Sequence, residues 1–230
     1  MRTRLLALTT LLALTASATR AEDAPKPNDS SIGAKPATDA IVLFNGENLD
    51  GWVKKDGKSP ATWKVEDGLL LVTPGQGDIK TTKSFGDFEM HVEFQVPYMP
   101  KARGQARGNS GIYLGGIDEL QVLDSYGLNS KNNDCGAIYT QAVPKVNACK
   151  PPLQWQTYDV TFHKARVEDG KVVKKARVTV IQNGIKTIDD AEIGPTPGGA
   201  GNKEGEDGPI LLQDHGNNVL YRNLWIKPLG

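Results

Sequence analysis

Apolar and polar side chains alternate without interruption from Asp87 to Val96, and this period of two constrains the fold more than any other feature of the chain. Because successive side chains of a strand point to opposite faces, the pattern predicts a half-buried antiparallel strand. Residues 155–164, 177–181 and 220–226 have similar patterns, and no segment predicts a helix longer than a turn or two. The inward-facing residues predicted for the first strand are Phe88, Met90, Val92, Phe94 and Val96.

Short turn sequences separate the predicted strands. The sequences Glu66-Asp67-Gly68, Glu168-Asp169-Gly170 and Asn183-Gly184 contain residues that tolerate a positive φ, so each predicts a β-hairpin. Strands with one apolar face bury that face best when two sheets pack against each other. We therefore predict an all-β fold, a β-sandwich of two antiparallel sheets that forms one domain over residues 40–230. The outer face of a curved sheet in such a fold offers a groove that suits a saccharide.

The N-terminus has the features of a targeting segment followed by a linker. Arg2 and Arg4 precede an apolar stretch at 5–14 and small residues up to Ala21, which is typical of a secretory signal peptide over residues 1–21. Residues 22–39 are rich in Pro, Ser, Ala, Asp and Lys without periodicity, which predicts a disordered linker. The sequence thus predicts an exported protein, periplasmic or extracellular, with no membrane association once the leader is removed.

The charge balance narrows the class of ligand. The chain has 27 basic and 27 acidic residues, so no net field attracts nucleic acid or an anionic membrane. A small neutral ligand such as a sugar is favoured, and the sequence leaves the oligomeric state open. Export would permit a disulfide between the only two cysteines, Cys135 and Cys149, but two buried thiols fit the sequence equally well.

Polar residues alternate along residues 107–125, which makes this segment the best candidate for a site. In the second of its two strand-like runs, Glu119 and Gln121 share a face roughly 7 Å apart, while Leu120 and Val122 face the other way. Glu119 is the best candidate for a general base or a metal ligand, the alternative being an exposed surface glutamate. Gln121 suits a contact to a substrate hydroxyl or carbonyl, or is an ordinary solvated strand residue.

Two further pairs of residues are candidates for contacts in the same site. Asn109 and Tyr113 share a face of the first run and suit sugar binding, although Tyr113 is as readily a packing aromatic. Gln213 and His215 follow an apolar strand at a turn, where the adjacent Asp214 can tune the histidine pKa. The alternative for His215 is a turn histidine bonded to the local backbone.

For Arg222 and Asp124, alternation along their strands does not place the side chain on the same face as the other candidate site residues. Arg222 has the parity of core residues, so it needs a carboxylate partner such as Asp124 or Asp214 unless a bulge turns it outward. Asp124 has the parity opposite to Glu119 and joins it only if a bulge re-aims it. The sequence contains no metal-binding motif and identifies no cofactor, but Glu119, Asp124 and His215 together would suit a divalent ion.

Several motifs that occur in order along the chain resemble the 3-keto-disaccharide hydrolases, also described as 3-keto-glucoside 1,2-lyases and 3-keto-2-hydroxy-glucal hydratases. The resemblance extends from about Ile41 to Leu229. The motifs are Leu43-Phe-Asn-Gly46, Leu49-Asp-Gly-Trp52, Arg107-Gly-Asn-Ser-Gly-Ile-Tyr113, Glu119-Leu-Gln-Val-Leu-Asp124, Cys135-Gly-Ala-Ile-Tyr139, Trp155-Gln156 and Leu212-Gln-Asp-His-Gly216.

This resemblance implies a concanavalin-A-like jelly-roll sandwich that cleaves glycosides already oxidised to a ketone at C3. A ketone at C3 acidifies the proton at C2, so a base can remove it, the C1 substituent can leave, and water can add. For this chemistry we assign proton transfer to Glu119, His215 and Asp124. The predicted substrate contacts are Gln121, Asn109, Tyr113, Arg222 and Gln213.

Two alternatives remain open at this point. A retaining β-glucan hydrolase places two carboxylates about 5 Å apart, whereas Gln121 occupies the position beside Glu119 where the second carboxylate would lie. A non-catalytic carbohydrate-binding module could use the same concave face. Relatives often carry an arginine where this chain has Gly115 and Gly116, which suggests a difference in specificity or a weakened activity.

Overall fold

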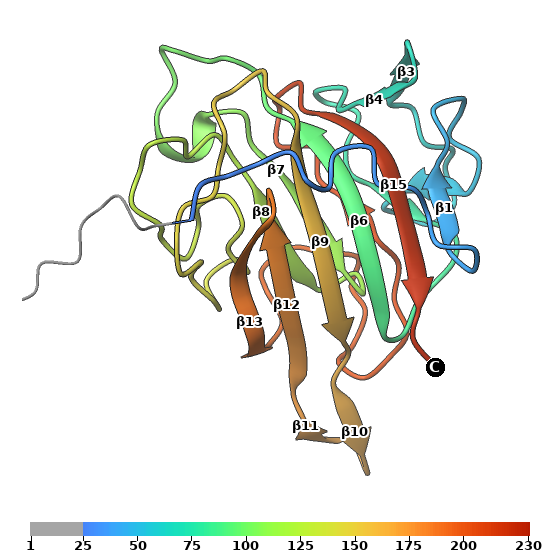
Figure 1. The fold of residues 1–230 in the computed structure, drawn as a ribbon. Coiled ribbons are helices and arrows are strands. Elements are labelled where there is room, and N and C mark those ends of the chain that lie inside the picture. The colour runs from blue at the N-terminus through green and yellow to red at the C-terminus, as the bar shows by residue number, and fades with distance from the viewer. Residues whose placement is uncertain (1–24) are drawn as a thin grey trace, which may run out of the picture.

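Two antiparallel β-sheets packed face to face account for nearly all the regular structure of residues 25–230 in a computed structural model (Figure 1). The predicted signal peptide, residues 1–21, lies outside the described residues. The predicted jelly-roll β-sandwich is therefore confirmed, and the described helical structure is limited to short turns such as η2 (Gly104–Ala106). No helix within residues 25–230 has the length and apolar character needed to span a membrane.

The large sheet has the strand order β13-β12-β9-β6-β15-β4-β3, and β1 also pairs with β15. The alternating strands predicted at residues 87–96, 155–164, 177–181 and 220–226 belong to it, and two of the predicted hairpin turns connect β3 to β4 and β12 to β13. Its strands are β1 (Ile41–Phe44), β3 (Lys64–Glu66), β4 (Leu69–Leu71), β6 (Phe88–Gln95), β9 (Gln156–His163), β12 (Ala176–Gln182), β13 (Ile185–Ile193) and β15 (Leu220–Pro228).

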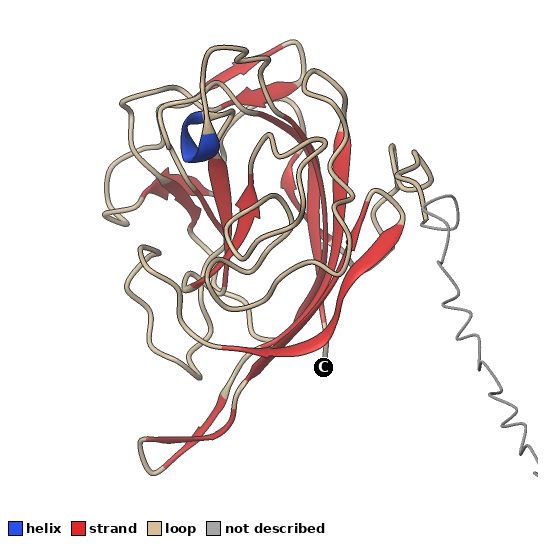
Figure 2. Ribbon diagram, turned by 90° about the vertical axis from the view of Figure 1, so that its left-hand side faces the viewer, coloured by secondary structure: helices blue, strands red, loops and turns tan. Residues whose placement is uncertain are grey.

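The small sheet has the order β2-β5-β14-β7-β8 and lies behind the large sheet in Figure 1. A third predicted hairpin, β10 (Arg166–Glu168) with β11 (Lys171–Lys174), projects beyond the body of the sandwich (Figure 2). The strands of the small sheet are β2 (Trp52–Lys54), β5 (Ile79–Thr81), β7 (Ser110–Leu114), β8 (Asp118–Val122) and β14 (Leu211–Leu212).

The core fills the space between the sheets with the inward-facing half of each alternating strand. The five residues predicted to face inward are each at most 2% exposed. Four of them lie in β6, and the fifth, Val96, follows the end of that strand. Aromatic pairs join β6 to β9, with ring centroids 5.1 Å apart for Phe88 and Phe162 and 4.7 Å apart for Phe94 and Tyr158. Each large apolar side chain buried in this way contributes about 1.5–3 kcal/mol to stability.

Both cysteines lie in this interior as free thiols. The Sγ atom of Cys135 is 3.1 Å from the hydroxyl oxygen of Tyr158, and that of Cys149 contacts backbone carbonyls. The structure thus has the thiol form of the two alternatives that the sequence leaves open.

The outer face of the large sheet is covered by the N-terminal segment. Residues 25–39 cross β9 and β6 in Figure 1 without forming a strand. The amide of Gly33 donates to Glu93, and the hydroxyls of Ser31 and Thr157 lie 2.7 Å apart. The prediction of a disordered linker is therefore wrong for this segment, because hydrogen bonds rather than apolar contacts hold it, and these leave no signal in its composition.

The connection from β8 to β9, residues 123–155, is long and contains no strand. Part of it lies along the free edge of β8 and forms backbone hydrogen bonds with that strand. The backbone N–H of Gln121 donates to the backbone carbonyl of Ala137, and the backbone N–H of Tyr139 donates to the backbone carbonyl of Glu119. These bonds satisfy the polar backbone groups that an edge strand otherwise leaves open. The connection thereby places Tyr139 beside the outer face of β8.

Candidate functional site

A pocket of about 280 Å³ lies on the outer face of the small sheet, where β7 and β8 are neighbours. Residues from four other parts of the chain complete its wall. Its lining residues are Gln105, Asn109, Tyr113, Glu119, Gln121, Tyr139, Pro197, Gly198, Gln213 and His215.

Glu119 is the one carboxylate among these lining residues, and the strand pairing of β8 fixes its position. Its backbone amide donates to the hydroxyl of Thr196 at 2.9 Å, and its carboxylate oxygen Oε2 lies 3.0 Å from the hydroxyl of Tyr113. The side chain is almost fully buried, and this desolvation raises its pKa to about 7. The Tyr113 hydrogen bond partly opposes that rise, while the negative charge of Asp78 adds to it.

Tyr113 lies directly opposite Glu119 in the β7–β8 register, which is why the two side chains meet on one face. Its hydroxyl oxygen also lies 3.0 Å from the carbonyl oxygen of Pro197 and accepts a hydrogen bond from Gln213 at 3.3 Å. Burial, followed by the proximity of Glu119, raises the pKa of Tyr113 well above its ordinary value. The phenol is therefore protonated near neutral pH.

Two glycines provide the space that this pair needs. A Cβ atom at Gly111 would lie 2.4 Å from Oε1 of Glu119, and one at Gly198 would lie 2.5 Å from the hydroxyl of Tyr113. Gly111 has an ordinary backbone conformation, so its role is to leave room rather than to permit a turn. Any larger residue there would push the carboxylate out of its position.

Three side-chain amides in the pocket have carbonyl oxygens without hydrogen-bond partners: those of Asn109, Gln121 and Gln213. The NH₂ group of Asn109 donates to the backbone carbonyl of Gln105, and that of Gln121 donates to the carbonyl of Asn133. Because a carbonyl can only accept, these bonds fix the orientation of both amides. A buried acceptor without a donor is costly, so the pocket is suited to a ligand with several hydroxyl groups.

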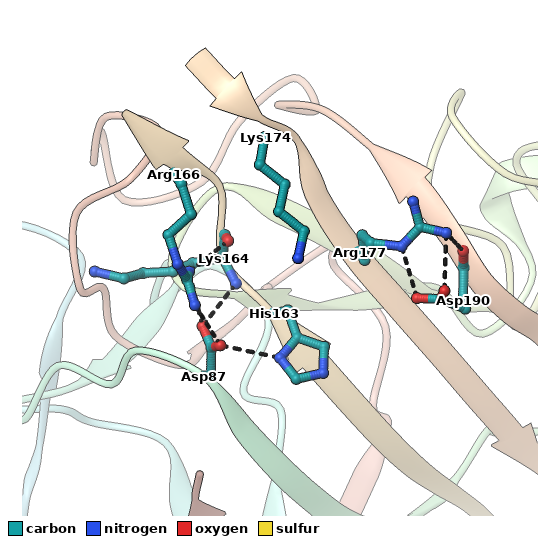
Figure 3. A pocket seen from close by; sticks show the side chains of 7 residues that line it. All are labelled: Asp87, His163, Lys164, Arg166, Lys174, Arg177 and Asp190. Carbon is teal, nitrogen blue, oxygen red and sulfur yellow. Dashed lines mark hydrogen bonds and ion pairs between the residues drawn. The ribbon is translucent and has the colours of Figure 1, made fainter. Parts of the chain in front are cut away.

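A larger cavity, of about 450 Å³, lies beside the β10–β11 hairpin and differs in this respect (Figure 3). Both carboxylates that line it are paired with arginines: Arg166 donates to Asp87, and Arg177 donates to Asp190. His163 also contacts Asp87 at this rim. The smaller pocket, which holds unpaired acceptors and a buried acid, is the better candidate for a site.

A family model of the 3-keto-alpha-glucoside-1,2-lyase-like domain matches residues 39–227, which include every residue of the pocket. The chain belongs to this family. A 3-keto-disaccharide hydrolase from Bacteroides thetaiotaomicron is 26% identical over 239 residues, which cover 82% of this chain and 78% of that protein.

Solved structures agree with membership of the 3-keto-alpha-glucoside-1,2-lyase-like family. A candidate glycosyl hydrolase from Parabacteroides distasonis is 41% identical, with a TM-score of 0.76 over 84% of each chain. A second from the same organism is 24% identical, with a TM-score of 0.61 over 83% of this chain and 94% of that one, and it shows the common fold alone.

In this member of the family the structure brings together most of the residues singled out from the sequence. Glu119 and Gln121 share the pocket face as predicted, and Asn109, Tyr113 and Gln213 lie around them. His215 also lines the pocket, from an exposed position after β14. The sequence did not predict the side-chain hydrogen bonds among these residues. Those bonds form because β7 pairs with both β8 and β14.

Asp124 does not line the pocket, so the structure does not bring it together with Glu119 and His215. It follows the end of β8 with the parity opposite to Glu119, and its carboxylate pairs with Arg107 at 2.6 Å. The same carboxylate accepts a hydrogen bond from the amide of Tyr126. Asp124 therefore stabilises the exit of β8 rather than contacting a ligand.

Arg222 also lies outside the pocket, apart from the other residues predicted to contact substrate. A register shift in β15, where Asn223 has a positive φ of 45°, turns Arg222 onto the outer face of the large sheet. There it pairs with Glu93 at 2.8 Å and lies over the ring of Trp155 at 3.8 Å. His91 is buried on the same face, against Asp159.

Asp124 therefore does not join Glu119 and His215 in the three-residue metal site that the sequence had suggested. Among residues 25–230, no three His, Cys, Asp or Glu side chains converge in a way that could hold a metal ion. Gly115, in the turn between β7 and β8, is not among the residues that line the pocket, and nor is Gly116.

Sequence reasoning missed the loop residues of the site. Gln105, Pro197 and Gly198 line the pocket. The hydroxyl of Thr196 donates to the backbone carbonyl of Ile117 and accepts a hydrogen bond from the backbone N–H of Glu119. They lie outside any alternating segment, so periodicity could not reveal them. Tyr139 could have been found, because it ends one of the motifs that carry the family resemblance.

Proposed function

We propose that this protein is an exported enzyme that cleaves 3-keto-glycosides, with Glu119 as the general base. The observation that carries the proposal is a single buried carboxylate, with a pKa raised to about 7, in a pocket with unpartnered amide oxygens. A base with a pKa near neutrality is ionised often enough to accept a proton and acidic enough to return it. Family membership and the name of the Bacteroides relative support the substrate class.

The reaction would proceed in two stages. In the first, the Glu119 carboxylate removes the C2 proton, the electron pair forms a C1–C2 double bond, and the C1–O bond breaks. The leaving oxygen takes a proton from the carboxylic acid of Glu119, which restores the base. In the second stage, water adds at C1 and C2 takes up a proton, so the sum of the two stages is hydrolysis.

The other pocket residues would hold the sugar and stabilise the charge that develops on the C3 oxygen. The oxygens of Asn109, Gln121 and Gln213 would accept hydrogen bonds from the remaining hydroxyl groups. His215, at the exposed rim, is positioned to donate a proton or a hydrogen bond to an oxygen of the substrate.

The lining of the pocket favours this chemistry over that of an ordinary β-glucan hydrolase. Such an enzyme needs two carboxylates, about 5 Å apart if it retains configuration and about 6.5–9.5 Å apart if it inverts. The pocket is lined by one carboxylate only. A proton next to a ketone can be removed by one base, so the composition of the pocket matches elimination.

The decisive assay compares three substrates: a 3-keto-disaccharide, the same disaccharide without the ketone, and a β-glucan. We expect release of the aglycone sugar from the 3-keto compound alone. Cleavage of none of them, together with saturable sugar binding that survives Glu119→Gln, would instead indicate a carbohydrate-binding module. Equal cleavage of the oxidised and unoxidised disaccharides would rule out a role for the ketone.

A further inference from the structure

The hydroxyl of Tyr113 lies among three hydrogen-bonding partners, and it has only one proton to donate. Two of them, Oε2 of Glu119 and the carbonyl oxygen of Pro197, are acceptors, each 3.0 Å away. The third, the NH₂ group of Gln213, donates to the hydroxyl oxygen at 3.3 Å. When Glu119 is ionised, the hydroxyl can satisfy only one of its two acceptors at a time.

Electrostatics decides which acceptor takes the proton in each state of Glu119. A hydrogen bond to a carboxylate is about twice as strong as one to a neutral carbonyl, so the hydroxyl donates to Glu119 while it is ionised. Once Glu119 is protonated, its own O–H can donate to the tyrosine oxygen, which frees the tyrosine proton for Pro197. The hydroxyl oxygen then accepts from Glu119 and Gln213 and donates to Pro197, which fills all its hydrogen-bonding positions.

We infer that Tyr113 is a positioning residue whose hydroxyl turns between Glu119 and the Pro197 carbonyl as Glu119 loses and gains its proton. This inference rests on the proposed function of Glu119 as a base. Only hydrogens move, because the heavy atoms already lie at bonding distance in both states. Glu119 therefore keeps one position as it removes a proton from the substrate and returns it.

The surrounding residues hold the side chains of Tyr113 and Glu119 in place, so the Tyr113 hydroxyl can donate only to Glu119 or to the Pro197 carbonyl. The register of β7 with β8 fixes the ring opposite Glu119, and Gly111 and Gly198 allow the walls of the pocket to approach both side chains. Thr196 ties the backbone of Glu119 to the loop that carries Pro197. The carbonyl of Pro197 has no other hydrogen-bond donor among the described residues.

Other titratable groups near Glu119 do not replace this role. Asp78 acts on Glu119 through its charge and contacts the loop after β14 through the amide of Asp214. Tyr139 and His215 line the pocket without a hydrogen bond to the carboxylate. Asp118, the neighbour of Glu119 in β8, points to the opposite face of the strand.

The test is an NMR titration of the ligand-free protein, which does not depend on any substrate. Carbon-13 in the glutamate carboxyls reports the pKa of Glu119, and the carbonyl carbon of Pro197 reports its hydrogen bond. We expect Glu119 to titrate near pH 7 and the Pro197 signal to titrate with it, shifting downfield at lower pH. In Tyr113→Phe we expect the pKa of Glu119 to rise by about one unit and the Pro197 signal to stop responding to pH.

Tyr139→Phe is the matched control, since it removes a hydroxyl from the same pocket without removing a bond to Glu119. It should leave the pKa of Glu119 unchanged. A Pro197 signal that ignores pH in the wild type, or an unchanged Glu119 pKa in Tyr113→Phe, would overturn the inference. If the titrations behave as expected but no 3-keto-glycoside is cleaved, the proposed function fails and the hydrogen-bond exchange stands.

Discussion

Asp118 and Glu119 are neighbours in β8, both are buried, and burial raises the pKa of each to about 7. Their environments are nevertheless opposite. Asp118 points between the sheets, where neither carboxylate oxygen has a hydrogen-bond partner and where the charge of Glu204 raises its pKa further. Glu119 points into the pocket and contacts Tyr113.

This difference shows that a perturbed pKa does not by itself identify a catalytic residue. Desolvation is the leading cause of both shifts, and it acts equally on a carboxyl group that a ligand can reach and on one that it cannot. Access to the pocket and a positioned partner distinguish Glu119. We therefore expect substitutions of Glu119 to affect activity and substitutions of Asp118 to affect stability.

The largest expected effect is on turnover. Glu119→Gln keeps the size of the side chain but removes the base, so kcat for a 3-keto-disaccharide should fall by about 10²–10⁴-fold. Asp118→Asn should keep kcat within a few-fold of the wild type. Steady-state assays of the three proteins at pH 8 make the comparison. A loss of activity in Asp118→Asn equal to that in Glu119→Gln would contradict the separation of roles.

The next effect is on stability and depends on pH. The pKa of Asp118 in the folded protein, about 7, exceeds its ordinary value, so the unfolded chain ionises first as pH rises from about 4 to 7. The contribution of Asp118 to stability is therefore greatest at low pH and is lost progressively up to pH 7. Asp118→Asn should remove this loss and stabilise the protein at pH 8 by up to about 4 kcal/mol.

Urea unfolding of the wild type and Asp118→Asn between pH 4 and pH 8 measures this difference. The two proteins should be closest in stability near pH 4 and differ most above pH 7. The titration of Glu119 cancels in the comparison, because both proteins contain it. A difference in free energy that does not change with pH would show that Asp118 is not protonated in the folded state.

The smallest of the three effects concerns the position of Glu119. Gly111→Ala places a methyl group where only 2.4 Å separates it from Oε1 of Glu119, so the carboxylate must move. We expect kcat to fall by about 10²-fold, as for a misplacement of about 1 Å, with a smaller effect on stability. Gly194→Ala is the control, since its added methyl would lie 3.9 Å from the nearest neighbouring atom, Oε1 of Gln141, which is an ordinary van der Waals distance. Full activity in Gly111→Ala would mean that the position of Glu119 is not critical.

The fold and half of the site could be predicted because both follow from period-two alternation. That pattern gave the strands of the large sheet and placed Glu119 with Gln121 and Asn109 with Tyr113 on common faces. It failed at Arg222, where a bulge at Asn223 reverses the parity that a regular strand would have. A positive φ at a single asparagine leaves no periodic signal in the sequence.

The remaining errors come from contacts that are distant along the chain. Thr196 and Pro197 meet Glu119 and Tyr113 from the far side of the pocket, 77 and 84 residues away. The segment at Gly33 is held by Glu93, 60 residues further along the chain. Polar contacts of this kind depend on the completed fold, so the local sequence cannot show them.

The most direct test of the central claim, that Glu119 cleaves a 3-keto-glycoside by removing its C2 proton, is the reaction in D₂O. Mass spectrometry and proton NMR of the earliest product measure deuterium at C2, with the isolated 3-keto-sugar as a control for spontaneous exchange. We expect one deuterium at C2 of each product molecule in the wild type, and in Glu119→Gln we expect cleavage and enzymatic exchange to slow together by about 10²–10⁴-fold. Product that retains its original hydrogen at C2 would contradict the claim.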